Sequence, residues 1–404
     1  MLKEFRVDNF KSLINFSFSP IGMNLLVGPN NAGKTNLAHA LRFLSLTSQM
    51  PLDDAAAACT ADPWNLLNVY LPKRTTVVLA ATAELLLDDE RLVFEYELTI
   101  ATGQGQRGLA SRGRPFVVQR ESLRVSGGRF SDTVLLENEG GRVKLLHEKR
   151  FLRAVPVETE PRYVETLAPT NATMLFRLFD LETNQRANLF KRYLGAWGYY
   201  SLEPARLRQN RARTLDVALD SDGSNLSSVL FTLHNANPRV EKAIIEAVKL
   251  LEPRLDLFSF QTPDPDHVYM FFEDKAGNRF GVDNVSDGTL RYLAMCCLVL
   301  TNRQRDGDIG APPVIIIEEP ENGIFVVHLK ALFERIEPSG AQGQFVFTSH
   351  SPYFIDLFDG AIEGLFVIRP GETNSTLVKP DPTRLAERLG KFSLGELHFR
   401  GLLE

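Results

Sequence analysis

The stretch Gly28–Thr35, GPNNAGKT, connects an apolar segment at Asn24–Val27 to a helical pattern through Leu37, Leu41 and Leu44. Leucines spaced by three and four residues predict a helix, and a short apolar run before a glycine-rich turn predicts a buried strand. The turn fits G-x-x-x-x-G-K-[ST], the pattern of a phosphate-binding loop, in the strand–loop–helix context that this loop requires. The sequence therefore predicts a nucleotide site on an α/β fold.

The loop residues have separate expected roles in binding ATP and Mg²⁺. Backbone N–H groups of the turn and the helix N-terminus would surround the phosphates, Lys34 would reach the β and γ oxygens, and Thr35 would offer its hydroxyl to Mg²⁺. An ordinary glycine-rich turn with a solvated lysine is the alternative. The residues expected at the nucleotide are Gly28, Pro29, Asn30, Asn31, Ala32, Gly33, Lys34, Thr35 and Asn36.

The rest of the chain predicts a series of strands, then helices, and then alternating strands and helices. Five segments separated by glycine-rich turns predict an antiparallel sheet. They are Thr75–Leu87, Arg91–Ile100, Pro115–Val125, Thr133–Asn138 and Arg142–His147. Helical spacing follows at Phe176–Leu194 and Asn225–Leu251, with helix-breaking residues at Asp222–Gly223 and at Pro238, and an apolar helix is expected at Thr289–Leu300. The final third alternates strand and helix, which predicts a parallel sheet with crossover helices.

An acidic segment lies at Val314–Phe325, VIIIEEPENGIF. Four apolar residues before two acids predict a buried strand whose carboxyl end presents carboxylates, where α/β sheets place their ligands. Glu318 is a candidate ligand of Mg²⁺, directly or through water, and Glu319 is a candidate to orient or deprotonate the attacking water. A strand followed by a solvated acidic turn is the alternative.

Two further turns carry polar residues that suit a nucleotide. Phe345–Pro352, FVFTSHSP, predicts an apolar strand ending at His350, whose imidazole can donate a hydrogen bond to the leaving phosphate. A lone histidine is more often structural, but this one ends the strand next in order after the acidic one. In Val285–Leu293, VSDGTLRYL, Ser286 and Gly288 predict a second anion site at a helix N-terminus. A plain N-cap explains this turn equally well.

Composition limits the class of protein. Lys and Arg number 45 against 50 Asp and Glu, a net charge of −5, so any contact with nucleic acid must be a local patch. No apolar run approaches the roughly 20 residues of a membrane helix, and the first ten residues do not have the pattern of a signal peptide. Cys59, Cys296 and Cys297 form no CxxC pair, so no structural zinc site is expected. We expect a cytoplasmic protein without a membrane partner.

The order of these motifs resembles that of ABC-type ATPases. The opening VDNFKSL (Val7–Leu13) and the two asparagines of GPNNAGKTN are typical of the branch containing SMC, RecF and OLD-family proteins. Within that branch, EEPENGI and SDGTLRYL are similar to the stand-alone bacterial AAA-type predicted ATPases, many of them near defence or toxin genes. The resemblance covers about residues 1–48 and 280–370, with a weaker match at Tyr199–Arg208 and Ser221–Leu230.

This resemblance implies an ABC-ATPase head of the P-loop NTPase class, with an antiparallel β-subdomain and an inserted α-helical lobe. It also implies a head-to-tail homodimer, or a higher oligomer, that sandwiches two ATP molecules. Lys34 and Thr35 of one subunit would face Ser286 and Gly288 of the other.

By the same resemblance, Glu319 would be the hydrolytic base and His350 the γ-phosphate switch. Glu321–Asn322 would form the contact that runs between the two sites.

Three departures bear on these implied roles. Glu318 replaces the aspartate usual in the wider superfamily and is one methylene longer, which bears on direct Mg²⁺ coordination. Val285 and Asp287 depart from the LSGGQ sequence of transporters, which argues against a transporter subunit. The glutamine that joins the two lobes is unplaced: Tyr199–Gln209 is expected by position, and Gln119 is a poorer candidate.

Three segments are expected. Residues 1–200 would be the N-terminal part of lobe I with the P-loop and the β-subdomain, 201–302 a helical lobe II with the signature-like turn, and 303–404 the C-terminal part of the core. No heptads are long enough for a coiled-coil arm. The residues after Arg369 are too few for the Toprim nuclease domain of OLD proteins, so we expect a partner to cut any nucleic acid that is cut.

Two basic clusters are candidate phosphate contacts, with binding that would weaken steeply as salt rises. The first, in PARLRQNRART, comprises Arg206, Arg208, Arg211 and Arg213. The second and weaker one comprises Lys149, Arg150 and Arg153. A solvated face or an intersubunit role is favoured for the first cluster.

Two functions remain open at this point. The first is an ATP-hydrolysing ABC-type ATPase whose ATP-driven dimerisation switches DNA engagement or a partner effector, a nuclease or toxin, in DNA maintenance or antiviral defence. The second is a non-hydrolysing, nucleotide-bound scaffold for such a partner, which Glu318 and the unplaced glutamine keep open.

Overall fold

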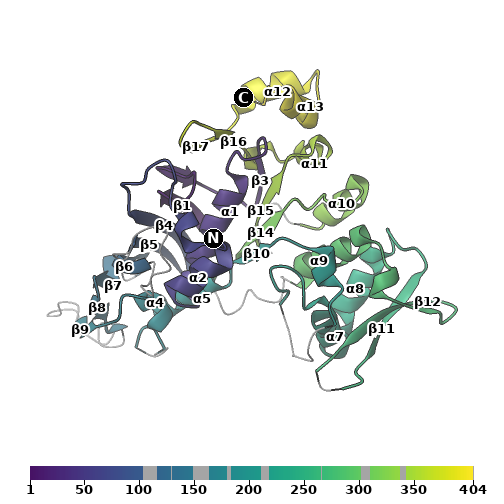
Figure 1. Cartoon of the computed structure of the whole chain (residues 1–404), viewed down its shortest axis with the longest axis horizontal. Helices are drawn as coiled ribbons and strands as arrows, with labels where there is room; N and C mark the ends of the chain where they lie inside the picture. The colour runs from purple at the N-terminus through teal and green to yellow at the C-terminus, as the bar shows by residue number, and fades with distance from the viewer. Residues whose placement is uncertain are drawn as a thin grey trace.

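The computed structural model of the chain contains two large sheets, one small sheet and surrounding helices (Figure 1). It describes residues 1–102, 116–128, 130–148, 163–179, 183–210, 218–264, 266–301, 310–336 and 343–403. An antiparallel sheet lies at one end of the molecule and a helical lobe with the small sheet at the other, with the second large sheet between them (Figure 1).

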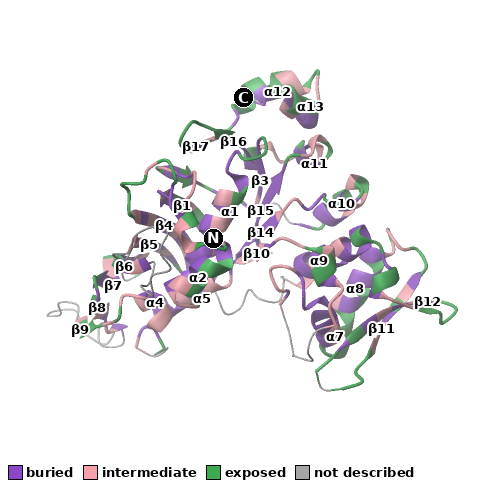
Figure 2. Ribbon diagram, in the orientation of Figure 1, coloured by how far each residue is buried: buried purple, intermediate pink, exposed green. Residues whose placement is uncertain are grey.

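The central six-stranded sheet carries the nucleotide motifs. Its strand order is β10-β14-β15-β3-β16-β17, and all neighbouring strands are parallel except β16 and β17. The strands are β10 (Gly198–Tyr200), β14 (Val314–Glu318), β15 (Gln344–Ser349), β3 (Met23–Val27), β16 (Leu365–Pro370) and β17 (Ser375–Val378). The inner strands are apolar and buried on both faces, as parallel strands covered by other elements must be (Figure 2). The expected parallel sheet is therefore confirmed.

The eight-stranded sheet is antiparallel throughout, in the order β2-β1-β4-β5-β6-β7-β8-β9. Its strands are β1 (Leu2–Asp8), β2 (Phe16–Phe18), β4 (Thr76–Leu87), β5 (Glu90–Thr102), β6 (Phe116–Gly127), β7 (Phe130–Glu139), β8 (Arg142–Leu146) and β9 (Tyr163–Leu167). The antiparallel sheet expected from five segments is confirmed as β4 to β8. The edge strand β9 is largely exposed and carried too weak an alternation to be predicted.

The helices cover the central sheet and build the helical lobe (Figure 1). They are α1 (Lys34–Thr47), α2 (Leu52–Cys59), α4 (Met174–Arg177), α5 (Gln185–Gly195), α6 (Pro204–Leu207), α7 (Leu226–Ala236), α8 (Pro238–Val248), α9 (Asp287–Thr301), α10 (Val326–Phe333), α11 (Pro352–Ile355), α12 (Pro382–Leu389) and α13 (Leu394–Phe399). Short 3₁₀ turns occur at Pro63–Leu66, Val282–Asn284, Asp356–Phe358 and Ile362–Gly364.

Two ranges with helical spacing each contain parts of two helices, and the break predicted at Pro238 is confirmed. The range Phe176–Leu194 contains the end of α4 and most of α5, with non-helical residues described between them. The range Asn225–Leu251 is divided into α7 and α8. The break has a local cause: the Asn237 side chain caps α8 by accepting the Val240 N–H at 3.2 Å, and Pro238 takes the first helical position, where its missing N–H costs nothing.

The helical lobe has its own small core. Helices α7, α8 and α9 pack with the three-stranded sheet β11 (Leu255–Gln261), β12 (Tyr269–Asp274) and β13 (Arg279–Gly281). The longest helix among the described residues is α9, with 15 residues. The part of the chain that the structure describes therefore contains no coiled-coil arm. Every helix in it is also too short or too polar to cross a bilayer.

One buried side chain joins the two large sheets. Gln344, the first residue of β15, accepts the Leu2 backbone N–H at 2.5 Å and donates to the Leu2 carbonyl at 2.9 Å. Its amide therefore satisfies both backbone polar groups of a buried residue at the start of β1.

We expect Gln344→Leu to lower the free energy of unfolding by about 2–5 kcal/mol, because leucine fills a similar volume but leaves two buried backbone groups without partners. Urea denaturation measures this change. The control is Gln119→Leu at an exposed position on β6, which should change stability by less than about 0.5 kcal/mol. Equal stabilities of the two variants would show that Gln344 does not hold the sheets together.

Candidate functional site

The P-loop joins β3 to α1 through a left-handed turn. Asn31 has φ +63° and Gly33, the residue before α1, has φ +110°. A Cβ on Gly33 would lie 2.3 Å from the Ser375 hydroxyl oxygen, so both the backbone conformation and the close approach require glycine. The first backbone N–H groups of α1 follow directly, and these unpaired donors are what phosphate oxygens bind at helix N-termini.

Lys34 is buried against its own loop. Its ammonium group donates to the carbonyl oxygens of Gly28 at 2.7 Å and Pro29 at 3.1 Å. Burial lowers the pKa of Lys34, and the carboxylates of the acidic segment, Glu319 above all, oppose that shift. The lysine and the acidic segment are thus close enough within one chain to influence each other.

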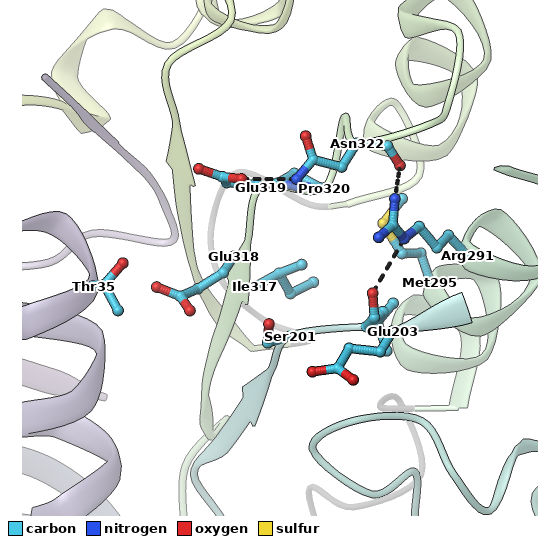
Figure 3. Close-up of a pocket in the computed structure, with 11 residues that line it drawn as sticks. Thr35, Ser201, Glu203, Arg291, Met295, Ile317, Glu318, Glu319, Pro320 and Asn322 are labelled. Carbon is cyan, nitrogen blue, oxygen red and sulfur yellow. Dashed lines mark hydrogen bonds between the residues drawn. The ribbon is translucent and has the colours of Figure 1, made fainter. Parts of the chain in front are cut away.

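The two acids after β14 point in different directions. Glu318 ends the strand, and Glu319 has φ +44° while its backbone N–H donates to the Thr348 carbonyl on β15 at 3.0 Å. Glu318 extends towards Thr35, and Glu319 Oε2 accepts a hydrogen bond from the Asn322 amide at 2.7 Å (Figure 3). The left-handed turn therefore gives the two neighbouring carboxylates separate surroundings.

His350 lies next to Glu319. It directly follows the last residue of β15, and strand β15 lies between β14 and β3 in the sheet. The Nδ1 atom of His350 is 3.2 Å from Glu319 Oε1. Glu321 instead faces inward: it is buried, accepts the Ser349 hydroxyl at 2.5 Å, and burial raises its pKa. The adjacent ends of parallel strands thus bring together side chains that are far apart in sequence.

A cavity of about 260 Å³ lies between α1 and the acidic segment (Figure 3). Its polar lining includes Thr35, Ser201, Glu203, Glu318 and Glu319. Ser286 is not among the lining residues of this cavity, and neither is Gly288.

The cavity suits Mg²⁺ by the chemistry of its donors. Oε1 of Glu318 is buried and has no hydrogen-bond partner among the described residues, and the carboxylate points towards Thr35 (Figure 3). Hard cations take oxygen ligands of this kind. The described residues contain no group of three or more His, Cys, Asp or Glu that could hold a metal ion alone. Phosphate oxygens and water would therefore complete the coordination, as is usual for Mg²⁺.

The Ser286 turn begins α9 and is tied to its surroundings. The Ser286 hydroxyl accepts the Thr289 backbone N–H at 3.1 Å, which is an N-cap. A Cβ on Gly288 would lie 2.1 Å from the Gly323 carbonyl oxygen, so only glycine permits this approach. The Arg208 guanidinium donates to the Val285 carbonyl at 2.8 Å.

Arg291 on α9 joins the helical lobe to the acidic segment. Its Nη1 donates to the Asn322 carbonyl at 2.7 Å, and its Nε donates to the Leu202 carbonyl at 3.1 Å (Figure 3). One side chain therefore holds the segment after β10 and the loop after β14 together.

A second cavity, of about 270 Å³, adjoins the P-loop. Its lining includes Ser12, Asn31, Asn36, Tyr70 and Asn374. Asn31 and Asn36 were expected at the nucleotide from the P-loop motif, whereas Ser12, Tyr70 and Asn374 were not predicted. Ser12 belongs to the FKS of the opening motif, and this motif was the available signal for it. Nothing in the sequence indicated that the loops bearing Tyr70 and Asn374 converge on the second cavity.

No glutamine lines the first cavity among the described residues. At the position where the lobe-joining glutamine was expected, Ser201, Leu202 and Glu203 follow β10 and line the cavity. Gln119 lies on β6, in the antiparallel sheet.

The first arginine cluster is partly neutralised. Arg206 pairs with Asp222 at 3.7 Å and Arg208 with Asp287 at 2.7 Å. The remaining members of that cluster, Arg211 and Arg213, lie outside the described residues. So do all three members of the second cluster, Lys149, Arg150 and Arg153.

Sequence reasoning also missed three side chains near the site. His39 on α1 and Tyr199 on β10 are hydrogen-bonded at 3.2 Å. His398 on α13 has its pKa lowered by burial and further by Lys34 and His350, which places the C-terminal helix near the P-loop lysine. Such long-range proximity leaves no local pattern in the sequence.

Comparison with known proteins identifies the family. The family described as "AAA domain, putative AbiEii toxin, Type IV TA system" matches residues 114–356, more than half of the chain. The chain belongs to this family. The matched range contains the Ser286 turn, the acidic segment and His350, and it begins after the P-loop. No curated protein matches the chain.

Solved structures show the fold of this family member. A head of SMC bound to the C-winged helix domain of ScpA has a TM-score of 0.56 and 12% identity, covering 96% of this chain and 99% of that one. An Smc head with an extended coiled coil, bound to the C-terminal domain of ScpA from Pyrococcus furiosus, has a TM-score of 0.50 and 11% identity, covering 96% and 98%. The expected SMC-like ABC-ATPase head with an antiparallel β-subdomain is confirmed.

We expect acid to destabilise the protein through His39. Burial, followed by the charges of Lys11 and Arg42, lowers the pKa of His39 to about 3, whereas an unfolded histidine titrates near 6.5. Below pH 6.5 the folded state therefore binds fewer protons than the unfolded state. The stability that neutral His39 contributes above pH 6.5 is lost as the pH falls below that value. Between pH 7 and pH 5, the wild type should lose about 2 kcal/mol more stability than His39→Gln, which cannot titrate. Urea unfolding at the two pH values tests this, and equal losses would contradict it.

Proposed function

We propose that the protein binds ATP with Mg²⁺ and hydrolyses it, and that two copies of the chain close head to tail around the nucleotide. The observation that carries this proposal is the single cavity onto which Thr35, Glu318 and Glu319 converge. Membership of an AAA-domain family and the SMC-head fold support the ATPase class.

The phosphates would lie at the N-terminus of α1. There, the backbone N–H groups and the Lys34 ammonium group would stabilise their negative charge. Lys34 would exchange its present bonds to Gly28 and Pro29 for phosphate oxygens. Thr35 and Glu318 would hold Mg²⁺, which supplies charge neutralisation at the transferring phosphoryl group.

Glu319 and His350 would act on the water and the γ-phosphate. Glu319 is positioned by Asn322 and lies beside His350, so its carboxylate can accept a proton from the attacking water. The His350 imidazole can donate to a γ-phosphate oxygen. These roles are the ones expected from the motifs, and they stay predictions until the variants below are measured.

The second cavity would take the base and ribose. It adjoins the P-loop through Asn31 and Asn36 and offers the exposed ring of Tyr70, which is 65% exposed, as a stacking surface.

Dimerisation would bring the Ser286 turn to the nucleotide of the other subunit. Ser286 and Gly288 are absent from the lining of the cavity in their own chain, whereas they lie at the N-terminus of α9, the end of a helix that favours anions. The output of closure would be a partner effector, a nuclease or toxin, or DNA. The family description names a putative toxin and a Type IV TA system. Because Arg206 and Arg208 are paired with aspartates, a protein partner is the favoured output.

The division into segments 1–200, 201–302 and 303–404 stays a prediction, as does a role in DNA maintenance or antiviral defence. Limited proteolysis with and without ATP would report on the segment boundaries, because closure protects exposed linkers.

We expect Glu319→Gln to retain binding of ATP with Mg²⁺ and to lower turnover by about 100-fold or more, since a general base contributes roughly 10²–10⁴ to rate. A stable dimer should then appear on size-exclusion chromatography with ATP. Phosphate release and binding of a fluorescent ATP analogue provide the measurements. The matched control, Glu246→Gln on α8, changes an exposed glutamate far from the site and should behave as the wild type. Wild-type turnover in Glu319→Gln would remove Glu319 from its role.

The alternative is a scaffold that binds nucleotide without hydrolysing it, favoured by the glutamate at position 318 and the missing glutamine in the cavity lining. Phosphate release by the wild type, with and without DNA, separates the two functions. A rate equal to that of Lys34→Ala supports the scaffold, and a rate well above it supports the ATPase.

A further inference from the structure

A chain of hydrogen bonds leads from the opening motif to the acidic strand. Lys11 Nζ lies 2.6 Å from His39 Nδ1, His39 Nε2 lies 3.2 Å from the Tyr199 hydroxyl, and that hydroxyl lies 2.6 Å from Glu318 Oε2. The four residues come from the loop after β1, from α1, from β10 and from β14.

The chemistry of the groups fixes the direction of every bond. An ammonium group can only donate, so His39 Nδ1 accepts and its Nε2 carries the proton. The Tyr199 oxygen therefore accepts from His39, and its own single proton goes to Glu318 Oε2. A tyrosine phenol is protonated at neutral pH, so Tyr199 carries the proton that it donates.

Two side chains of α1 contact the Tyr199 ring. The Arg42 guanidinium lies 4.5 Å from the ring centre, and the His39 ring meets it edge-on at 5.5 Å. Residues 39 and 42 are three apart and so share one face of the helix. The hydroxyl that reaches Glu318 is thus fixed by packing as well as by hydrogen bonds.

This arrangement gives Glu318 two unequal oxygens. Oε2 is occupied by Tyr199, whereas Oε1 is buried without a partner among the described residues, and the carboxylate is turned towards Thr35 (Figure 3). Glutamate has one more rotatable bond than aspartate, so it reaches farther but loses more freedom when it is fixed. The hydrogen bond from Tyr199 to Oε2 limits that extra freedom of the Glu318 side chain.

We propose that Tyr199 is a positioning residue that holds Glu318 Oε2 and so presents Oε1, with the Thr35 hydroxyl, to Mg²⁺. This inference rests on the proposed nucleotide function and goes beyond it by explaining how a glutamate serves where an aspartate is usual. Hydrogen-bond partners that orient a metal ligand commonly contribute 10–100-fold to metal affinity.

The test is Tyr199→Phe, which removes the hydroxyl and keeps the ring that contacts Arg42. Affinity for a fluorescent ATP analogue is measured with Mg²⁺ and with EDTA, and Mn²⁺ binding is followed by electron paramagnetic resonance. We expect the nucleotide affinity of Tyr199→Phe in EDTA to differ from that of the wild type by less than about twofold. The ratio of the affinity with Mg²⁺ to the affinity in EDTA should fall about tenfold. The control Tyr163→Phe loses a hydroxyl bonded at 3.1 Å to the Val134 carbonyl in the antiparallel sheet and should leave both affinities unchanged.

A double-mutant cycle with Glu318→Asp separates positioning from a general structural role. The shorter aspartate cannot keep the bond to Tyr199, so Tyr199→Phe should change metal-dependent binding less than about twofold in that background. An equal loss in both backgrounds, or wild-type metal dependence in Tyr199→Phe, overturns the inference alone. A wild-type protein that binds no nucleotide under either condition overturns the proposed function and the inference with it.

Discussion

The parallel alignment of β14, β15 and β3 is the constraint on which the site depends. Glu318 is paired with Thr348, and Ser349 with Val27, so the P-loop, the acids and His350 leave the sheet from adjacent strand ends. The side chains that meet in the site come from chain positions that differ by more than 300 residues. Without this register, the lysine, the carboxylates and the imidazole would have no common location, because each lies on a separate loop.

Two left-handed turns set the directions of the polar groups at these strand ends. One, at Gly33, begins α1 with its N–H groups free, and the other, at Glu319, divides two adjacent carboxylates between different neighbours. A non-glycine residue with positive φ is uncommon and costs backbone energy. Here the Thr348 carbonyl stabilises that conformation by accepting the Glu319 N–H. The residue with positive φ thus lies where the two carboxylates diverge.

Much of this site could be predicted because its motifs are local. The strand–loop–helix pattern at residues 24–44 and the apolar run before Glu318 each specify an element and the polar group at its end. The lengths of helices were less predictable: the spacing at Phe176–Leu194 spans the end of α4 and most of α5. The break at Pro238 was predictable from the proline itself, and the structure adds the Asn237 cap on α8. Tyr199 and His398 were missed because their roles depend on packing between distant segments, and β10 has only three residues from which to recognise a strand.

The contacts of α9 have a mechanical consequence. Gly288 lies against the Gly323 carbonyl, and Arg291 grips the carbonyls of Asn322 and Leu202. Helix α9 is therefore joined to the loop after Glu319 through the carbonyls of Asn322 and Gly323. We therefore expect a molecule that displaces the helical lobe to displace the backbone next to Glu319, at the edge of the cavity, as well.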